Sequence, residues 1–387
     1  MTITPESKSL KIVLASWAPF IGGAEVAVER LAVGLRDAGH DVRLIVGTRG
    51  EALDRFEAVG LRCEFIQQRF TDKLGWLKFR SARNRVMRSL AADRPDLVHS
   101  NDLTTHQLIS DAAGRLGLPR VCHHRWLFER GAIDWLNKFG AERHLFVSKA
   151  FMKQMLDASE TLSKAATALV YDGLAMPMLK PENDRLKLRK VLALPTDKQV
   201  IVFTGQIIER KGVADLLNGW AEIAPQWSHR AELCLVGDDL AGEGAYRRKM
   251  EQLAKALGAP VRFVGFQKNV DDWLAVADIA VVPSHIEPLG LAAMEAMAQS
   301  RPVIGGDAGG IPEMVVHEET GLLVPPKTPS AIANALQRLL ADAALRQRMG
   351  LAARQRCEEL FSIDAHVRAV VAEYRTVLAS TPAGMPA

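Results

Sequence analysis

Residues 284–295 read Ser-His-Ile-Glu-Pro-Leu-Gly-Leu-Ala-Ala-Met-Glu, and the rest of the chain is organised around this stretch. Residues 279–282 are an apolar run typical of a buried strand, and a helix is expected to begin near Leu291. Pro288 suits the turn that opens a helix, because the N–H that proline lacks has no intrahelical partner there. Gly290 allows the backbone to come close to a ligand. The stretch therefore predicts a strand, a short loop and a helix that faces a ligand.

The predicted helix end and two acidic side chains indicate the chemistry of that ligand. The first N–H groups of a helix are unpaired and carry partial positive charge, so they favour an anion. Glu287 lies on the loop, and Glu295 lies a turn or two into the helix. Their carboxylates accept hydrogen bonds, and sugar hydroxyls donate them. We therefore predict a phosphate at the helix end with hydroxyl-bearing rings beside it, as in a sugar nucleotide.

The spacing of the two glutamates resembles the Glu, seven residues, Glu signature of family 4 retaining glycosyltransferases, which have the GT-B fold. The flanking segments that carry the same resemblance are Val264-Gly265-Phe266, Trp273-Leu274-Ala275-Val276-Ala277-Asp278, Arg301-Pro302-Val303-Ile304, Gly309-Gly310-Ile311-Pro312-Glu313 and Gly321-Leu322-Leu323-Val324. The resemblance implies an α/β protein with two Rossmann-like, doubly wound domains that face each other across a cleft. It places an acceptor-side domain at residues 1–178, a donor-binding domain at 186–365, and a C-terminal helix of about 366–380 against the first domain.

Length and composition favour two domains. The chain has 387 residues, of which 48% are hydrophobic, so each half can bury a core. A formal net charge of +4 is too mild to indicate nucleic acid as a partner. No apolar run approaches the ~20 residues that span a bilayer, and Cys63, Cys122, Cys234 and Cys357 match no metal-ligand spacing. We expect a cytoplasmic protein, peripheral at most on the inner face of the cytoplasmic membrane.

An alternation of strand and helix patterns opens the chain. Residues 11–16 form a short apolar run, and Gly22-Gly23-Ala24-Glu25 leads into a helix that ends near Gly39. Further strand patterns follow at residues 41–46, 96–99, 120–123 and 144–148. This order predicts a parallel sheet covered by helices on both faces. Gly22 and Gly23 are not spaced as the dinucleotide fingerprint G-x-G-x-x-G. The resemblance implies that they bring backbone N–H groups to the donor phosphates and the acceptor, and an ordinary tight turn is the alternative.

Two adjacent histidines lie at the end of the strand pattern that begins at residue 120. Side chains of adjacent strand residues point to opposite faces, so only one of His123 and His124 can reach the crevice at the strand end. The resemblance implies a histidine near the reacting sugar at this place, and we assign it to His124, with His123 as the second choice. The alternative is a histidine held in the core by hydrogen bonds. The same alternation argues against a metal pair, and no metal ligands are predicted.

Basic and apolar residues are interleaved over residues 69–90. One acid, Asp72, accompanies the basic residues Arg69, Lys73, Lys78, Arg80, Arg83, Arg85 and Arg88. Trp76 and Leu77 are among the apolar residues between them. Basic amphipathic helices bind anionic membrane surfaces, so a peripheral membrane contact is one hypothesis. The alternative is a solvated helix whose apolar stripe packs on its own sheet.

A loop in the second half is predicted to bind the donor diphosphate. An apolar run at residues 199–204 ends at Gly205-Gln206, and Arg210-Lys211-Gly212 follows before a helix. In the resembling family an Arg stands in the place of Gln206, and that Arg and the Lys bind the diphosphate. Lys211 matches this pattern, whereas Gln206 supplies no charge, so Arg210 is the candidate to replace it. Phe266, at the end of a further strand pattern, is expected to line the base pocket.

The resemblance also implies a reaction. A sugar would pass from a UDP- or GDP-linked donor to a saccharide or lipid-linked acceptor with retention at the anomeric carbon. Glu295 would bind the ribose hydroxyls, and Glu287 the hydroxyls of the transferred sugar. No cofactor or metal is expected, since the sequence has no Asp-x-Asp motif. The leaving diphosphate would be stabilised by Lys211, Arg210 and the helix end at Pro288, Leu289, Gly290 and Leu291. Such enzymes commonly build cell-surface polysaccharides, lipopolysaccharide or glycolipids.

Three other classes of protein are compatible with the sequence. A sugar-nucleotide epimerase of the same fold would act on the donor without an acceptor. A phosphorylase of this fold usually needs lysine-bound pyridoxal and a longer chain. A non-catalytic sugar-nucleotide-binding protein is the third, and Gln206 is the one feature that favours it. Product analysis without acceptor, an absorbance scan and a donor-hydrolysis assay separate these alternatives.

Overall fold

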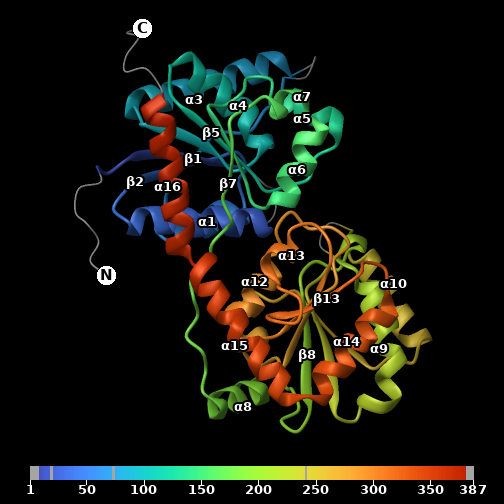
Figure 1. The fold of residues 1–387 in the computed structure, drawn as a ribbon. Helices are drawn as coiled ribbons and strands as arrows, with labels where there is room; N and C mark the ends of the chain where they lie inside the picture. Colours follow the sequence, from blue (N-terminus) through green and yellow to red (C-terminus); the bar gives the residue numbers. More distant parts are fainter. Residues whose placement is uncertain (1–7, 18–20, 72–74, 240–241, 381–387) are drawn as a thin grey trace. The chain divides into compact units, whose positions relative to one another are not determined.

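The computed structural model describes residues 8–17, 21–71, 75–239 and 242–380, and the chain divides into two compact units (Figure 1). Unit 1 comprises Met1–Ala175 and Ile363–Ala387, and unit 2 comprises Met176–Ser362. The chain therefore leaves unit 1 once and returns to it with its last helix.

Unit 1 contains a parallel sheet of seven strands in the order β3-β2-β1-β4-β5-β6-β7. Its strands are β1 (Lys11–Ser16), β2 (Asp41–Val46), β3 (Arg62–Phe65), β4 (Leu97–Ser100), β5 (Arg120–His124), β6 (Arg143–Phe146) and β7 (Thr167–Leu169). The central strands are apolar on both faces because helices cover both sides of the sheet. The strand order reverses between β1 and β4, so the loops that follow these strands leave in opposite directions and open a crevice at their carboxyl ends.

Helices cover both faces of this sheet (Figure 1). They are α1 (Gly23–Asp37), α2 (Glu51–Ala58), α3 (Trp76–Asp93), α4 (Leu103–Arg115), α5 (Arg130–Leu136), α6 (Lys149–Ala158), α7 (Glu160–Ser163) and α16 (Ile363–Ser380). One core lies under α1, α2 and α16, where Leu31, Phe56 and Tyr374 are fully buried. The other lies under α3 and α4 and contains Phe79 and Ala112. The last helix is thus part of the unit 1 core.

Unit 2 contains a parallel sheet of six strands in the order β10-β9-β8-β11-β12-β13. Its strands are β8 (Gln199–Thr204), β9 (Ala231–Val236), β10 (Val261–Gly265), β11 (Ile279–Val282), β12 (Val303–Gly306) and β13 (Gly321–Val324). The order reverses between β8 and β11. A ligand crevice is therefore expected where the loops after β8 and β11 meet.

The helices of unit 2 complete a second doubly wound layer structure. They are α8 (Glu182–Val191), the 3₁₀ turn η1 (Glu209–Lys211), α9 (Val213–Trp227), α10 (Ala245–Ala256), α11 (Val270–Val276), α12 (Leu291–Ala298), α13 (Ile311–Met314), α14 (Pro329–Ala341) and α15 (Ala343–Leu360). The predicted α/β class with two Rossmann-like sheets is confirmed. Across the described residues, no helix is both long and apolar enough to cross a membrane.

Candidate active site

The loops after β8 and β11 are in direct contact at the point where the strand order of unit 2 reverses. The backbone N–H of His285 donates to the carbonyl of Arg210 at 2.8 Å. Gly212 has a left-handed backbone with φ of 69°, and a Cβ built on it would lie 2.1 Å from the carbonyl oxygen of Pro283. No other residue fits there without displacing backbone, so Gly212 fixes how closely the two loops approach.

Glu287 is the centre of the charged contacts between these loops. Its Oε1 forms an ion pair with Lys211 Nζ, accepts a hydrogen bond from Ser284 Oγ at 3.0 Å, and lies 3.6 Å from Arg210 Nη1. The hydrogen bonds that Glu287 accepts from side chains of the described residues both go to Oε1 and leave Oε2 without one. Burial of the side chain opposes its ionisation, but the charges of Lys211 and Arg210 outweigh burial and hold the pKa of Glu287 below its usual value. The site therefore presents an ionised carboxylate between two cations, with one oxygen left for a ligand.

A second pair of side chains joins the same two loops. His285 Nε2 lies 2.5 Å from a carboxylate oxygen of Asp215, which is in the first turn of α9. Both side chains are largely buried, with 18% and 17% of their surface exposed. Because Lys211 and Gly212 directly precede α9, this contact holds the start of that helix against the β11 loop. The sequence analysis missed this pair.

The start of α12 is built as the sequence predicted, with a glycine before the first helical residue. Gly290 has φ of 107° and directly precedes Leu291. The carbonyl of Glu287 accepts a hydrogen bond from the N–H of Gly310 at 2.9 Å. Gly309 allows this contact, because a Cβ there would lie 2.1 Å from the same carbonyl oxygen. The loop that carries the acidic residue and the helix end is therefore braced from both sides.

The other residues predicted on this stretch lie along the same segment. Leu289 is buried, while Pro288 and Leu291 are half-buried. Glu295 lies one turn beyond Leu291 and is half-buried. The structure therefore places the residues from Glu287 to Glu295 on one continuous loop and helix, and Glu287 at its start contacts Lys211.

Three glycines bring the ends of β8, β9 and β10 together. The N–H of Gly205 donates to Val236 at 3.0 Å, and that of Gly237 donates to Gly265 at 2.9 Å. A Cβ on Gly237 would lie 1.8 Å from the carbonyl oxygen of Gly205. Gln206 and Phe266 directly follow two of these glycines. Gln206 is half-buried, and Phe266 is 50% exposed, so an apolar ring is available at this edge of the sheet.

In unit 1 the predicted glycines open α1. Gly22 is the residue before the helix and Gly23 is its first residue. The Gly22 N–H donates to Glu25 Oε2 at 2.9 Å. Burial raises the pKa of Glu25 to about 7, and the charge of nearby Asp102 adds to that rise, although the hydrogen bond from Gly22 opposes it. The loop is therefore held by a buried carboxyl group that titrates close to neutral pH.

A buried arginine connects this loop to the ends of β4 and β5. Arg125 Nη2 lies 2.7 Å from Asp172, and its Nη1 donates to Asn101 Oδ1 at 2.7 Å. Asn101 Nδ2 in turn donates to the carbonyl of Ala24 at 3.1 Å. Only 2% of the Arg125 side chain is exposed. The sequence analysis gave Arg125 no role, although it directly follows His124 at a strand end, which was the available signal.

The structure buries both histidines predicted for the crevice. His124 points to the α4 side of the sheet, where Nε2 hydrogen-bonds His144 Nδ1 at 2.9 Å and the ring stacks on Phe146. His123 points to the opposite face, against His99 and His366. Neither ring has exposed surface. In this arrangement His124 is a core residue and offers no exposed atom to a substrate, as in the alternative stated for it above.

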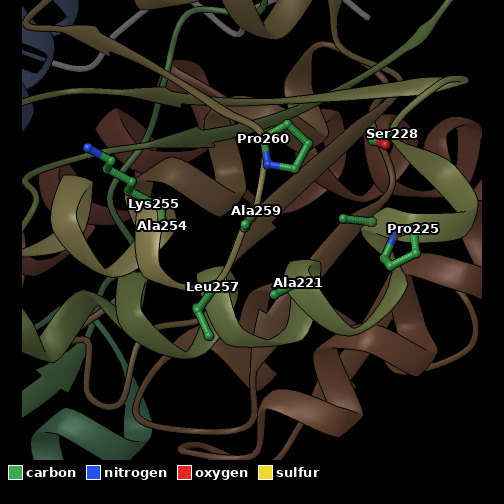
Figure 2. A pocket seen from close by; sticks show the side chains of 10 residues that line it. Ala221, Pro225, Ser228, Ala254, Lys255, Leu257, Ala259 and Pro260 are labelled. Atoms are coloured by element: carbon green, nitrogen blue, oxygen red, sulfur yellow. The ribbon is translucent and has the colours of Figure 1, made fainter.

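A hollow of about 410 Å³ lies elsewhere in unit 2, between α9 and α10 (Figure 2). Figure 2 shows Ala221 and Pro225 of α9 on one side and Ala254 of α10 on the other, while the Lys255 side chain points away from them. The predicted site residues do not line it. This shallow, mostly apolar hollow is therefore separate from the candidate active site.

Comparisons with known proteins agree with this geometry. The family described as "Glycosyl transferases group 1" matches residues 184–356, and the family described as "Glycosyl transferase 4-like domain" matches residues 22–167. The chain belongs to the group 1 glycosyltransferases of family 4, has the GT-B fold and is a transferase enzyme.

Individual relatives span almost the whole chain. A D-inositol 3-phosphate glycosyltransferase of Jonesia denitrificans is 33% identical over 375 residues, which cover 89% of this chain and 84% of that protein. An uncharacterised glycosyltransferase of Methanocaldococcus jannaschii is 26% identical over 395 residues, covering 95% of this chain and 99% of that protein. The crystal structure of HepE from Anabaena with UDP and glucose matches with a TM-score of 0.84 at 22% identity, over 95% of this chain and 100% of that one. The first relative supports the family, and the solved structure supports the fold.

Proposed function

We propose that this glycosyltransferase moves a sugar from a nucleotide diphosphate donor to a saccharide or lipid-linked acceptor with retention at the anomeric carbon. The observation that carries the proposal is the charged group of Lys211, Arg210 and Glu287 beside the start of α12. Two cations and the open N–H groups of a helix suit a diphosphate, and an ionised carboxylate suits sugar hydroxyls.

Each residue has a part in the proposed reaction. Negative charge develops on the departing diphosphate, where Lys211, Arg210 and the α12 end stabilise it. Glu287 Oε2, the oxygen without a hydrogen bond among the described residues, accepts hydrogen bonds from the transferred sugar and fixes its position. Glu295 accepts hydrogen bonds from the ribose hydroxyls. Transfer needs no divalent cation or cofactor in this proposal, because the two basic side chains and the helix end balance the phosphate charge.

Arg210 supplies the charge that Gln206 lacks. Its guanidinium group lies 3.6 Å from the carboxylate of Glu287, on the same side as Lys211. Gln206, half-buried beside Gly205, contributes a neutral hydrogen bond to the phosphates. Phe266 is exposed enough to pack against the nucleobase. In unit 1 the Gly22 N–H is already donated to Glu25 Oε2, so Gly23 is the glycine proposed to offer its backbone N–H to a ligand.

A uridine nucleotide is the first donor to test. HepE, which shares the fold, has been crystallised with UDP, with UDP and glucose, and with UDP-glucose. GDP-linked sugars are the second choice. The proposed setting is the synthesis of cell-surface polysaccharide or lipopolysaccharide at the inner face of the cytoplasmic membrane, with the protein in the cytoplasm.

Helix α3 supports the membrane part of this proposal. The helix begins at Trp76 rather than at Arg69, and residues 72–74, which include Asp72 and Lys73, lie outside the described part of the chain. Its apolar stripe packs on the sheet of unit 1 through Phe79, Ala82, Val86 and Leu90. This is the packing expected under the alternative of a solvated helix. Trp76 and Leu77 are nevertheless 53% and 72% exposed. The exposed basic residues beside them are Lys78, Arg80, Arg85 and Arg88. An apolar end with a basic flank suits an anionic lipid surface.

The proposal is tested by donor binding followed by product analysis. A donor at one hundred times its Kd stabilises the protein by about 2.7 kcal/mol, so UDP-, GDP- and ADP-sugars are screened by thermal unfolding. The best donor is then incubated with acceptors, and NMR of the product reports the anomeric configuration. A new epimer of the donor formed without acceptor would indicate an epimerase. Tight binding with neither transfer nor slow donor hydrolysis would indicate a non-catalytic binding protein.

A further inference from the structure

A row of polar side chains crosses three strands in the core of unit 1. The register pairs Ser100 of β4 with Cys122 of β5, and Cys122 with His144 of β6. His124 follows two residues after Cys122, so it lies on the same face, one step towards the carboxyl end. All four residues are buried. A thiol and two imidazoles thus meet on one face of the sheet, on the side covered by α4.

The ligating atoms of this cluster are already close together. One atom from each of Cys122, His124 and His144 lies within 4.8 Å of the other two, and His124 Nε2 is 2.9 Å from His144 Nδ1. In a tetrahedral zinc site, Zn–N bonds near 2.0 Å and Zn–S bonds near 2.3 Å put neighbouring ligand atoms about 3.3–3.6 Å apart.

Hydrogen bonds leave one ring nitrogen of this cluster without a partner in the described structure. The bond between His124 and His144 uses Nε2 of His124, and Nδ1 of His124 is fully buried without a partner in the described structure.

A serine and a third imidazole adjoin the cluster on the side of α4. Ser100, the register partner of Cys122, has its Oγ 2.8 Å from His106 Nδ1. His106 Nε2 is 2.9 Å from the carbonyl of Gly140, which orients the ring. The hydroxyl and the third imidazole behind it are therefore the available fourth ligands.

We propose that Cys122, His124 and His144 bind one Zn²⁺ ion in the core of unit 1, with Ser100 or His106 completing the site. The site is closed and structural, and it takes no part in the proposed sugar transfer. Binding breaks the S–H bond of Cys122, forms a Zn–S bond, and releases one proton to solvent per ion. Because no ligand is exposed, the ion enters as unit 1 folds.

The test measures metal in the full-length, tag-free protein. Zinc is determined by elemental analysis in the wild type, Cys122→Ala, His144→Phe and the control Cys234→Ala, whose buried thiol lies on β9 of unit 2. The wild type and the control should carry about one zinc per chain, and the two site variants less than about a tenth of that. Zinc retained by the site variants would overturn the proposal.

If the variants do not fold, a second measurement on the wild type tests the zinc site. Wild-type protein is unfolded with a chelator and refolded with Co²⁺, which reports thiolate ligation as a near-ultraviolet charge-transfer band. The proposal predicts that band, together with uptake of about one ion and release of about one proton per chain. Wild-type protein without zinc after purification, and without the band after refolding, would show that the cluster is a hydrogen-bonded group of neutral side chains.

Discussion

The ion pair between Lys211 and Glu287 gives the sharpest stability prediction. Only 15% and 8% of the two side chains are exposed, so neither charge is well solvated. Removing one partner of a buried pair leaves a buried charge and costs about 3–5 kcal/mol. Arg210, 3.6 Å from the same oxygen, keeps a partner for Glu287 and should hold the cost of Lys211→Met near 2–3 kcal/mol. Glu287→Gln leaves two cations facing each other and should cost about 3–4 kcal/mol.

A double-mutant cycle isolates the interaction between the two charges. Lys211→Met, Glu287→Gln and the double variant are compared with the wild type by hydrogen exchange of the β8 and β11 amides, because a two-unit chain need not unfold in one step. The double variant should be more stable than the sum of the single losses predicts, by about 2 kcal/mol. Additivity within about 0.5 kcal/mol would refute the conclusion that this pair organises the site.

Three further predictions concern unit 1. In the folded protein the pKa of Glu25 is raised to about 7, so as pH rises the unfolded chain loses the Glu25 proton at lower pH than the folded chain does. The free energy of unfolding should therefore fall by about 3 kcal/mol between pH 4.5 and 7. Hydrogen exchange should show this slope in the wild type and lose it in Glu25→Gln. Arg125→Lys cannot reach both Asp172 and Asn101 and should cost about 2–4 kcal/mol, against less than about 1 kcal/mol for Arg143→Lys in the half-buried pair with Glu373. Equal urea midpoints for Arg125→Lys and Arg143→Lys would contradict the conclusion that the buried contacts of Arg125 stabilise unit 1. Replacing Trp76 and Leu77 by Ser should reduce binding to anionic vesicles at low salt, whereas Leu351→Ser, exposed on α15, should not. If the Trp76/Leu77 variant and Leu351→Ser pelleted equally with the vesicles, the proposal that this end of α3 binds membranes would be refuted.

The strands and the start of α12 followed from local pattern. Residues 11–16 and 41–46 form β1 and β2 with the predicted bounds, because strands covered on both faces are mostly apolar. α12 begins at Leu291 as expected, because Gly290 provides the turn before it.

The contacts within the candidate site did not follow from local pattern. Lys211 and Glu287 are 76 residues apart, and His285 and Asp215 are 70 apart. Such pairs depend on which strands are neighbours in the sheet, and periodicity reports only local structure. The assignment of His124 to the crevice depended on local pattern in the same way. The alternation of side chains along a strand places its ring on one face of the sheet, but it does not show that α4 covers that face. Cys122, His124 and His144 had no recognisable metal spacing for this reason, since they come from two strands joined by register.

The central claim is that a nucleotide diphosphate binds at Lys211 and the start of α12, with its ribose on Glu295. Calorimetric titration of UDP, or of the best donor from the screen, into wild type, Lys211→Met, Glu295→Ala and the control Lys255→Met tests it directly. Loss of one hydrogen bond to a charged group costs about 1.5–3 kcal/mol, so the two site variants should bind roughly 10- to 100-fold more weakly. Lys255→Met, altered at the separate hollow on α10, should bind as the wild type does. Unchanged affinity in both site variants would contradict the account.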